Sequence, residues 1–235
     1  MWTIYKREMS SYFRSPVAYC IMGFFMVLVG MFFWVRNLIY GSIYFSDVLS
    51  SLVTYLTFFA PLITMRLLAD EKKNGTEVLL RTAPVPMRKV VVGKYLAGLT
   101  LYLVMVGITL IYPIILTFLI DGGIPAGKNF SGYVAFILLG ACYLAISLFV
   151  SSFTANQGVA AVAGIVVLLI FYFMQSIGGT LGGTFGAVLQ WLSPLKRYSD
   201  FAMGGFNLAS LFYYISFTVV GVFLTVMNVE RTRWN

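Results

Sequence analysis

The 235-residue chain is strongly apolar and basic: hydrophobic residues make up 60% of it, charged residues only 10%, and the formal net charge is +8. A soluble domain carries about 25% charged residues, so this sequence has too little polar surface to coat a globule. It also has no histidine, the commonest general base and metal ligand. The composition predicts an integral membrane protein and disfavours a metalloprotease or a histidine-based proton relay.

The N-terminal segment WTIYKREMSSYFR has the spacing of an amphipathic helix. Apolar and aromatic residues recur on one face at steps of three and four, and basic residues lie on the others. The first set is Trp2, Tyr5, Met9 and Tyr12, and the second is Lys6, Arg7 and Arg14. We expect this helix, residues 1–15, to lie on the inner leaflet and to turn at Ser15–Pro16 into the first span. A helix that simply extends the first span inward is the alternative.

Long uncharged runs divide the chain into segments that can cross the hydrocarbon core, which takes about 20 apolar residues. The run 129–195 is too long for one helix, and the polar stretch SSFTANQG that starts at Ser151 divides it. We therefore predict an all-α membrane protein with one transmembrane domain, residues 1–235. Six spans are expected at about residues 16–35, 48–69, 93–120, 131–152, 158–177 and 208–228, and Pro113 allows a kink in the third. The first run is longer than a signal-peptide core and no A-x-A site follows it, so we expect it to be retained.

Basic residues are distributed unevenly between the two sides that six spans define. With the N-terminus inside, all but four of the 16 Lys and Arg residues lie in inner segments; the outer four are Arg36, Lys128, Lys196 and Arg197. This imbalance predicts that both termini are cytoplasmic. The positive charge is then explained by topology and by attraction to anionic lipids, not by nucleic-acid binding.

The stretch GGIPAGKN, residues 122–129, resembles a phosphate-binding P-loop up to its last letter. A P-loop has Ser or Thr there to hold magnesium, whereas this chain has Asn129. The stretch also follows a predicted membrane helix rather than a β-strand, and it lies in an outer loop. Gly122, Gly123, Pro125 and Gly127 are therefore interpreted as turn residues, and no nucleotide site is predicted.

The longest inner loop, Met65–Lys94, carries much of the polar sequence. The second span is expected to continue into it as a helix through Glu71, with Arg66 and Asp70 at the i,i+4 spacing of an ion pair.

A second, short helix is predicted at about residues 75–83 of this loop. Asn74 followed by Glu77 is a helix start signal, and Pro84 ends the helix. Val78, Leu79 and Leu80 give the helix an apolar surface. That surface suits either a groove in a partner protein or the inner membrane surface, and the residues alone do not decide between them.

The outer segment 178–207 is too apolar and too long for a simple connector. It is expected to form short re-entrant helices, with its glycines allowing close packing, and Lys196 with Asp200 as a surface pair. Within the spans, Gly140 and Gly164 are positions where helices can approach closely, and Cys20 and Cys142 are interpreted as packing residues. No ionisable residue falls near the middle of a span, which argues against an ion-coupled carrier.

At three places the sequence resembles the ABC-2 type permeases, the membrane subunits of ATP-binding-cassette exporters. These are KREMSSYFRSPVAY near the start, TMRLLADEKKNGTEVLLRTAP followed by GKYLAG, and LSPLKRYSDFAMG before the last span. The inner-loop motif is the most specific; it matches at Met65, Arg66, Ala69, Glu71, Gly75, Thr76, Leu80, Thr82 and Pro84. The chain is similar to the short six-span members linked to gliding motility and to nitrous-oxide-reductase maturation.

The resemblance implies a non-enzymatic permease in a bacterial or archaeal cytoplasmic membrane. Two permease chains, identical or related, would each dock a cytosolic ABC ATPase that holds ATP and magnesium, so no cofactor is expected on this chain. The N-terminal helix would be the elbow helix and residues 75–83 the coupling helix. The expected ATPase-coupling interface consists of Glu71, Gly75, Thr76, Glu77, Val78, Leu79, Leu80, Arg81, Thr82 and Pro84.

A cargo cavity is expected among polar residues of the second and fifth spans: Thr54, Tyr55, Thr57, Tyr172 and Gln175. Such a lining suits a lipid-like, peptide or amphipathic cargo better than a small ion. The rival function is a membrane scaffold that transmits force from the ATPase to a larger machine without transport. An intramembrane enzyme is disfavoured because the sequence offers no cluster of nucleophile, base or metal ligands.

Overall fold

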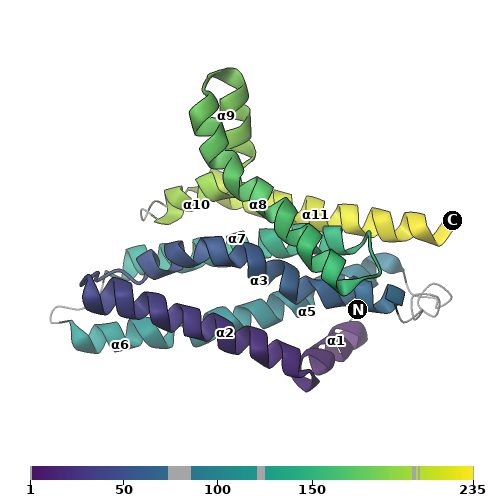
Figure 1. The fold of residues 1–235 in the computed structure, drawn as a ribbon, viewed down its shortest axis with the longest axis horizontal. Helices are drawn as coiled ribbons and strands as arrows, with labels where there is room; N and C mark the ends of the chain where they lie inside the picture. Colours follow the sequence, from purple (N-terminus) through teal and green to yellow (C-terminus); the bar gives the residue numbers. More distant parts are fainter. Residues whose placement is uncertain (1, 74–85, 121–124, 203–204, 206, 235) are drawn as a thin grey trace.

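A computed structural model of the chain describes residues 2–73, 86–120, 125–202, 205 and 207–234. All regular secondary structure in these residues is helical, and six helices are long and apolar enough to cross a membrane (Figure 1). The helices are α1 (Trp2–Arg14), α2 (Pro16–Phe33), η1 (Trp34–Ile39), α3 (Ser46–Lys73), α5 (Met87–Ile108), α6 (Ile111–Leu119), α7 (Ala126–Ser151), α8 (Gln157–Leu181), α9 (Gly183–Leu192), α10 (Pro194–Ala202) and α11 (Leu208–Trp234). The prediction of an all-α membrane fold with six spanning helices is confirmed.

The core of the bundle is built around α3 and α7. In these two helices 61% and 67% of the spanning window is buried, against 22% in α8 and 28% in α11. Two glycines bring helices together. A Cβ on Gly140 would lie 2.2 Å from the Tyr102 ring, and one on Gly164 would lie 2.9 Å from Pro61. The predicted close approaches at both glycines are therefore present. We call the end of the bundle where α3 ends and α5 begins the inner end, and the opposite end the outer end.

The chain turns sharply between α1 and α2 (Figure 1). Ser15 has an extended backbone, its side chain accepts a hydrogen bond from Val17 N at 3.4 Å, and Pro16 occupies the first helical position. Proline suits this position because its missing N–H would have no partner there. The predicted turn at Ser15–Pro16 is confirmed, and a straight extension of the first span is wrong.

The third span breaks just before Pro113, the residue at which the sequence allows a kink. Helix α5 ends at Ile108 and α6 begins at Ile111. Pro113 has no N–H to donate to the carbonyl oxygen of Thr109, four residues earlier. That oxygen accepts a hydrogen bond from Tyr133 Oη at 3.1 Å and one from Tyr112 N at 3.1 Å. A neighbouring helix thus supplies the donor that proline lacks.

Helix α7 starts earlier than the sequence predicts. It begins at Ala126, so Gly127, Lys128 and Asn129 form its first turn, and the interpretation of Gly127 as a turn residue is wrong. Asn129 is almost fully buried and accepts a hydrogen bond from Ser46 N, an interaction with α3 that the sequence does not reveal. The predicted polar break after Ser151 is confirmed, with Asn156 capping α8.

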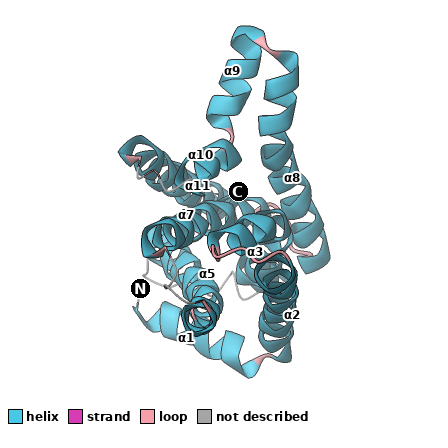
Figure 2. Ribbon diagram, turned by 90° about the vertical axis from the view of Figure 1, so that its left-hand side faces the viewer, coloured by secondary structure: helices cyan, strands magenta, loops and turns pink. Residues whose placement is uncertain are grey.

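The segment after the fifth span forms two short helices, as predicted. Helix α8 continues to Leu181, and the chain reverses at Gly182 and Gly183, whose φ angles of 60° and 62° favour glycine. Helix α9 then runs back along α8, and this hairpin projects from the rest of the bundle (Figure 2). A Cβ on Gly178 would lie 2.7 Å from the carbonyl oxygen of Gly186, so only small residues allow this approach. The predicted dip into the outer leaflet stays a prediction.

Candidate functional site

The N-terminal helix is attached to the inner ends of α3 and α5. Tyr12 Oη donates to the carbonyl oxygen of Ile63 at 2.6 Å, and burial raises the pKa of this hydroxyl well above its usual range, so it remains a donor. Tyr5 Oη donates to Thr100 Oγ1 at 3.1 Å. Tyr5 and Tyr12 on the aromatic face of α1 therefore pack on protein, whereas Trp2 is 66% exposed. The predicted position of this helix in the headgroup zone stays a prediction.

A buried lysine joins the same three helices. The side chain of Lys94 on α5 is 1% exposed; its ammonium group lies 3.3 Å from the Glu8 carboxylate of α1 and donates to the carbonyl oxygen of Leu67 on α3. A charge removed from water needs such partners to be tolerated. In the sequence, Lys94 is only one of the inner basic residues that predict the topology, and no local pattern marks it as buried.

Arg66 connects the last turns of α3 to the turn between α1 and α2. It forms the predicted i,i+4 ion pair with Asp70 at 3.8 Å, and its guanidinium group also donates to Ser15 Oγ. Together with the contacts of Tyr12 and Lys94, this interaction attaches the inner end of α3 to the N-terminal segment.

The predicted coupling interface follows directly after this point. Glu71 belongs to the last turn of α3, which runs to Lys73. The rest of the interface, Gly75, Thr76, Glu77, Val78, Leu79, Leu80, Arg81, Thr82 and Pro84, lies outside the described residues. In the sequence, residues 74–85 connect α3 to α5, and both of these helices pack in the bundle.

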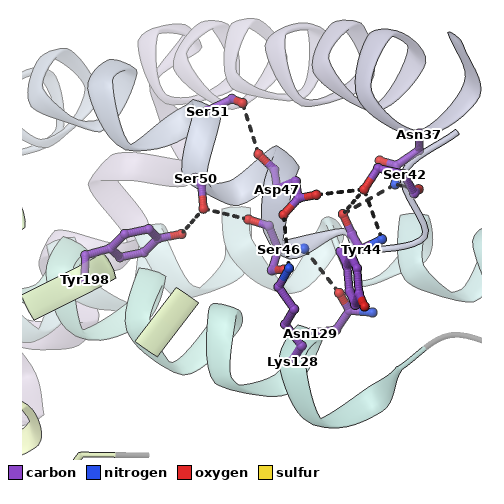
Figure 3. Close-up of polar contacts among 10 residues, drawn as sticks. All are labelled: Asn37, Ser42, Tyr44, Ser46, Asp47, Ser50, Ser51, Lys128, Asn129 and Tyr198. Atoms are coloured by element: carbon purple, nitrogen blue, oxygen red, sulfur yellow. Dashed lines mark hydrogen bonds and ion pairs between the residues drawn. The ribbon is translucent and has the colours of Figure 1, made fainter. Parts of the chain in front are cut away.

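At the outer end, α3 begins in a cluster of polar residues (Figure 3). Ser46 N donates to Asn129 Oδ1 at 3.2 Å, which ties α3 to α7. The Asp47 carboxylate accepts a hydrogen bond from Ser42 Oγ at 2.7 Å and lies 3.6 Å from Lys128 Nζ. We call this set the outer polar cluster: Asn37, Ser42, Tyr44, Ser46, Asp47, Ser50, Ser51, Lys128, Asn129 and Tyr198.

Some buried atoms of this cluster have unused hydrogen-bonding capacity. Asn37 Oδ1, Ser46 Oγ and Asn129 Nδ2 find no hydrogen-bond partner among the residues that the structure describes. Tyr198 of α10 reaches the cluster through a long contact, 3.4 Å from Ser50 Oγ, and burial raises the pKa of its hydroxyl to about 12. Among the described residues, the outer end of α3 is therefore less completely hydrogen-bonded than the inner end, where Thr64, Arg66 and the carbonyl oxygens of Ile63 and Leu67 have partners.

The structure brings together three of the five predicted cargo-cavity residues. Thr54 Oγ1 and Tyr172 Oη are 2.8 Å apart and join α3 to α8, and Gln175 lies one turn further along α8 beside Tyr172. Tyr55 turns away and packs its ring 5.5 Å from that of Phe32. Thr57 is fully buried and donates to the carbonyl oxygen of Thr54. Of the five predicted residues, Tyr172 and Gln175 line the pocket described next, Thr54 contacts it through Tyr172, and Tyr55 and Thr57 do not line it.

A pocket of about 700 Å³ opens beside Tyr172, between α8, α9 and α10. Lys196 donates to Gln190 Oε1 at 2.8 Å, so the expected pair with Asp200 is not formed. The pocket combines both charges, amides and hydroxyls with apolar walls; its lining is Tyr172, Phe173, Gln175, Ser176, Gly179, Gln190, Leu195, Lys196, Ser199 and Asp200. Gln190, Ser199 and Asp200 are polar residues in an otherwise apolar outer segment. This polarity is the signal that could have assigned them to the pocket.

Phe173 also borders a second, apolar groove of about 470 Å³ on the adjacent face of α8. That groove is lined by Val166, Leu169, Ile170, Phe173, Met174, Ile177 and Leu189. A polar pocket and an apolar groove thus meet at one side chain. The described residues contain no group of three or more Asp, Glu or Cys side chains that could hold a metal ion.

Comparison with known proteins agrees with this architecture. The chain is 27% identical over 232 residues to the probable ABC transporter permease protein NosY of Pseudomonas aeruginosa, covering 89% of this chain and 84% of that protein. The sequence profile of the ABC-2 family transporter proteins matches residues 2–229, nearly the whole chain. On this evidence the chain belongs to the ABC-2 family of transporter proteins.

Proposed function

We propose that this chain is the transmembrane subunit of an ATP-driven exporter, powered by a separate cytosolic ATPase. An ABC permease associates in general with an ATPase subunit and with a second permease. In the proposed assembly, two copies of the ATPase hold ATP and magnesium and bind the coupling segment, residues 75–83, of two permease chains. Both termini of the permease face the cytoplasm of a bacterium or archaeon.

The main observation in support of this proposal is the course of α3 through the bundle. It runs without a break from the outer polar cluster to Lys73, next to the coupling segment. On the way it bonds to α8 through Thr54 and Tyr172, beside the pocket. Pro61 interrupts the hydrogen bonding within this helix but approaches Gly164 of α8 closely, so a displacement of the coupling segment would be passed to α8 at this contact as well as at Thr54, in the way that packed helices transmit shear motions.

The pocket and groove on α8 suit an amphipathic cargo. Lys196 and Asp200 place both charges in the polar pocket, whereas the adjoining groove is apolar. A molecule with a polar head and a hydrocarbon portion would satisfy both surfaces, and a bare ion would leave the groove unused. A scaffold without transport remains the rival function.

The first test is a pull-down of the chain from its native membrane in mild detergent, followed by identification of a co-purifying ATPase. Leu79→Glu and Glu77→Lys should abolish co-purification, because they alter the proposed docking helix. Leu181→Glu is the matched control, since this exposed side chain lies at the outer tip of α8. Retention of the ATPase by both coupling variants would overturn the assignment of the coupling segment.

The rival scaffold is tested on the reconstituted complex. An exporter should show ATPase stimulation by an amphipathic cargo, and Gln175→Ala or Asp200→Ala should reduce that stimulation. An ATPase rate that responds to no amphipathic compound, in a complex that hydrolyses ATP, would favour the scaffold.

A further inference from the structure

Helix α1 carries a polar face opposite the face that packs on the bundle. Residues 7, 10, 11 and 14 are three or four apart, so they share one side of a helix with 3.6 residues per turn. Glu8 and Tyr12 point the other way, into contacts with α5 and α3. The polar face is formed by Arg7, Ser10, Ser11 and Arg14.

This face is hollowed into a pocket of about 430 Å³. Its lining is entirely polar: Arg7, Ser10, Ser11, Arg14 and Ser15. Ser10, Ser11 and Arg14 form no side-chain hydrogen bond or ion pair with any described residue, so their donors are available to a ligand. Arg7 is already paired with Glu8 at 2.8 Å.

The charge of the pocket is positive. Arg66 adds a third guanidinium group at its edge through the contact with Ser15. Among the side chains that the structure describes, the nearby carboxylates are engaged: Glu8 lies against Lys94 and Arg7, and Asp70 pairs with Arg66. Arginine forks and serine hydroxyls are donors of the kind that bind phosphate oxygens.

Exposed aromatic rings place this pocket at the depth of lipid headgroups. Trp2 and Phe13 project from the side of α1, 66% and 39% exposed. Phe13 packs edge-on against Tyr19 in the first turn of α2, with ring centroids 6.4 Å apart. Exposed Trp and Tyr rings at the start of a spanning helix are typical of the membrane–water interface. The neighbouring basic pocket therefore lies where lipid phosphates are found.

We propose that Arg7, Ser10, Ser11, Arg14 and Ser15 bind the phosphate of an anionic phospholipid. The bound lipid fastens α1 at the interface, and through Ser15 and Arg66 it steadies the inner end of α3. Binding needs only that α1 lies at a membrane surface, so the site is independent of cargo and of transport direction.

The site is tested with the full-length chain purified in detergent, by native mass spectrometry and thermal unfolding. Phosphatidylglycerol is the probe, phosphatidylcholine is the zwitterionic control and inorganic phosphate is the soluble control. The test variant is Arg7→Gln with Arg14→Gln. The matched variant Arg36→Gln with Arg231→Gln removes the same charge from exposed positions outside the pocket. Arg7→Lys with Arg14→Lys keeps the charge but loses the guanidinium forks.

Phosphatidylglycerol should remain bound to the native chain and raise its unfolding temperature more than phosphatidylcholine does. The double Gln variant should weaken this binding about tenfold or more, since a single charge-assisted hydrogen bond to phosphate contributes about this factor to affinity. The matched variant should bind as the native chain does, and the double Lys variant should bind with intermediate strength. Equal binding of both lipids, or unchanged binding by the double Gln variant, would overturn the proposal. Equal protection by inorganic phosphate would make this a soluble-anion site and overturn the lipid assignment.

Discussion

At its inner end, α3 accepts hydrogen bonds from neighbouring helices at backbone carbonyl oxygens. At its outer end, most contacts are hydrogen bonds between side chains and backbone in and around its first turns, and Asp47 adds a charged side chain. Tyr12 and Lys94 bind carbonyl oxygens of Ile63 and Leu67 at the inner end. At the outer end, Ser46 has a buried hydroxyl without a described partner. A buried unpaired polar atom costs about 1–3 kcal/mol, so the outer end is less stably fixed. For the proposed exporter, we therefore expect α3 to rearrange more readily at its outer end than at its inner end.

The largest expected effect comes from removing Glu8, which partners the buried Lys94. Glu8→Ala leaves the lysine charge with fewer partners, and breaking such a pair from one side costs roughly 3 kcal/mol. Thermal unfolding in detergent should show a large fall in midpoint. The double variant Glu8→Ala with Lys94→Met should recover part of the loss, because the buried charge is then absent. A single Glu8→Ala variant as stable as the native chain would contradict the inner attachment.

The close approach of α7 to α3 at the outer end is tested by Gly132→Ala. The added Cβ would lie 2.7 Å from Ser46 Cβ and force the helices apart, at a cost of about 2 kcal/mol. Gly127→Ala on the same helix meets nothing within 4 Å, so it should be neutral or slightly stabilising. The difference in unfolding midpoint between the two variants measures how closely α3 and α7 pack at Gly132. Equal midpoints would show that the two helices lie further apart there than the structure places them.

A smaller effect is expected from Tyr12→Phe. The change removes a 2.6 Å hydrogen bond to the backbone of α3 and keeps the ring packing, which should cost about 1 kcal/mol. Tyr19→Phe, at an exposed ring of α2, is the control and should have no measurable effect. Equal stability of Tyr12→Phe and the control would show that this hydrogen bond does not stabilise the protein.

The smallest effect is expected from Ser50→Ala in the outer polar cluster. Its contact with Tyr198 is long, 3.4 Å, and its 2.9 Å hydrogen bond goes to the Ser46 carbonyl oxygen within the same helix, which contributes little to stability, so we expect a loss of only about 0.5 kcal/mol. If this variant destabilised the protein more than Tyr12→Phe did, the proposed difference between the two ends of α3 would be reversed.

The spans could be predicted because length and hydropathy alone determine them. Pro113 and the polar stretch after Ser151 also marked real interruptions. Boundaries were less predictable: α7 starts at Ala126, and its first turn buries Asn129 against Ser46, a contact between residues 83 positions apart. No local pattern encodes such a pairing.

The side-chain assignments show the same limit. Periodicity found the aromatic face of α1 but not what covers it, because Tyr12 bonds to a backbone oxygen 51 residues away. Polarity in the spans pointed to Thr54, Tyr172 and Gln175, whereas Tyr55, one residue from Thr54, faces α2. Whether a polar residue of a span lines the pocket or packs in the core depends on the side of the helix that it occupies. Tertiary contacts determine which side of each helix borders the pocket.

The central claim is that α3 carries motion from the coupling segment to α8. It is tested most directly by thiol cross-linking of Ser176→Cys on α8 with Ser199→Cys on α10, two pocket-lining positions that leave the Thr54–Tyr172 contact intact, in a chain whose Cys20 and Cys142 have been replaced by Ser and Ala. The complex with its ATPase is reconstituted in vesicles and treated with a short bifunctional cross-linker, with and without a non-hydrolysable ATP analogue. The account predicts a cross-linking yield that changes with nucleotide, and loss of this change in Leu79→Glu. A yield that is the same in both nucleotide states, in a complex that binds the analogue, would contradict it.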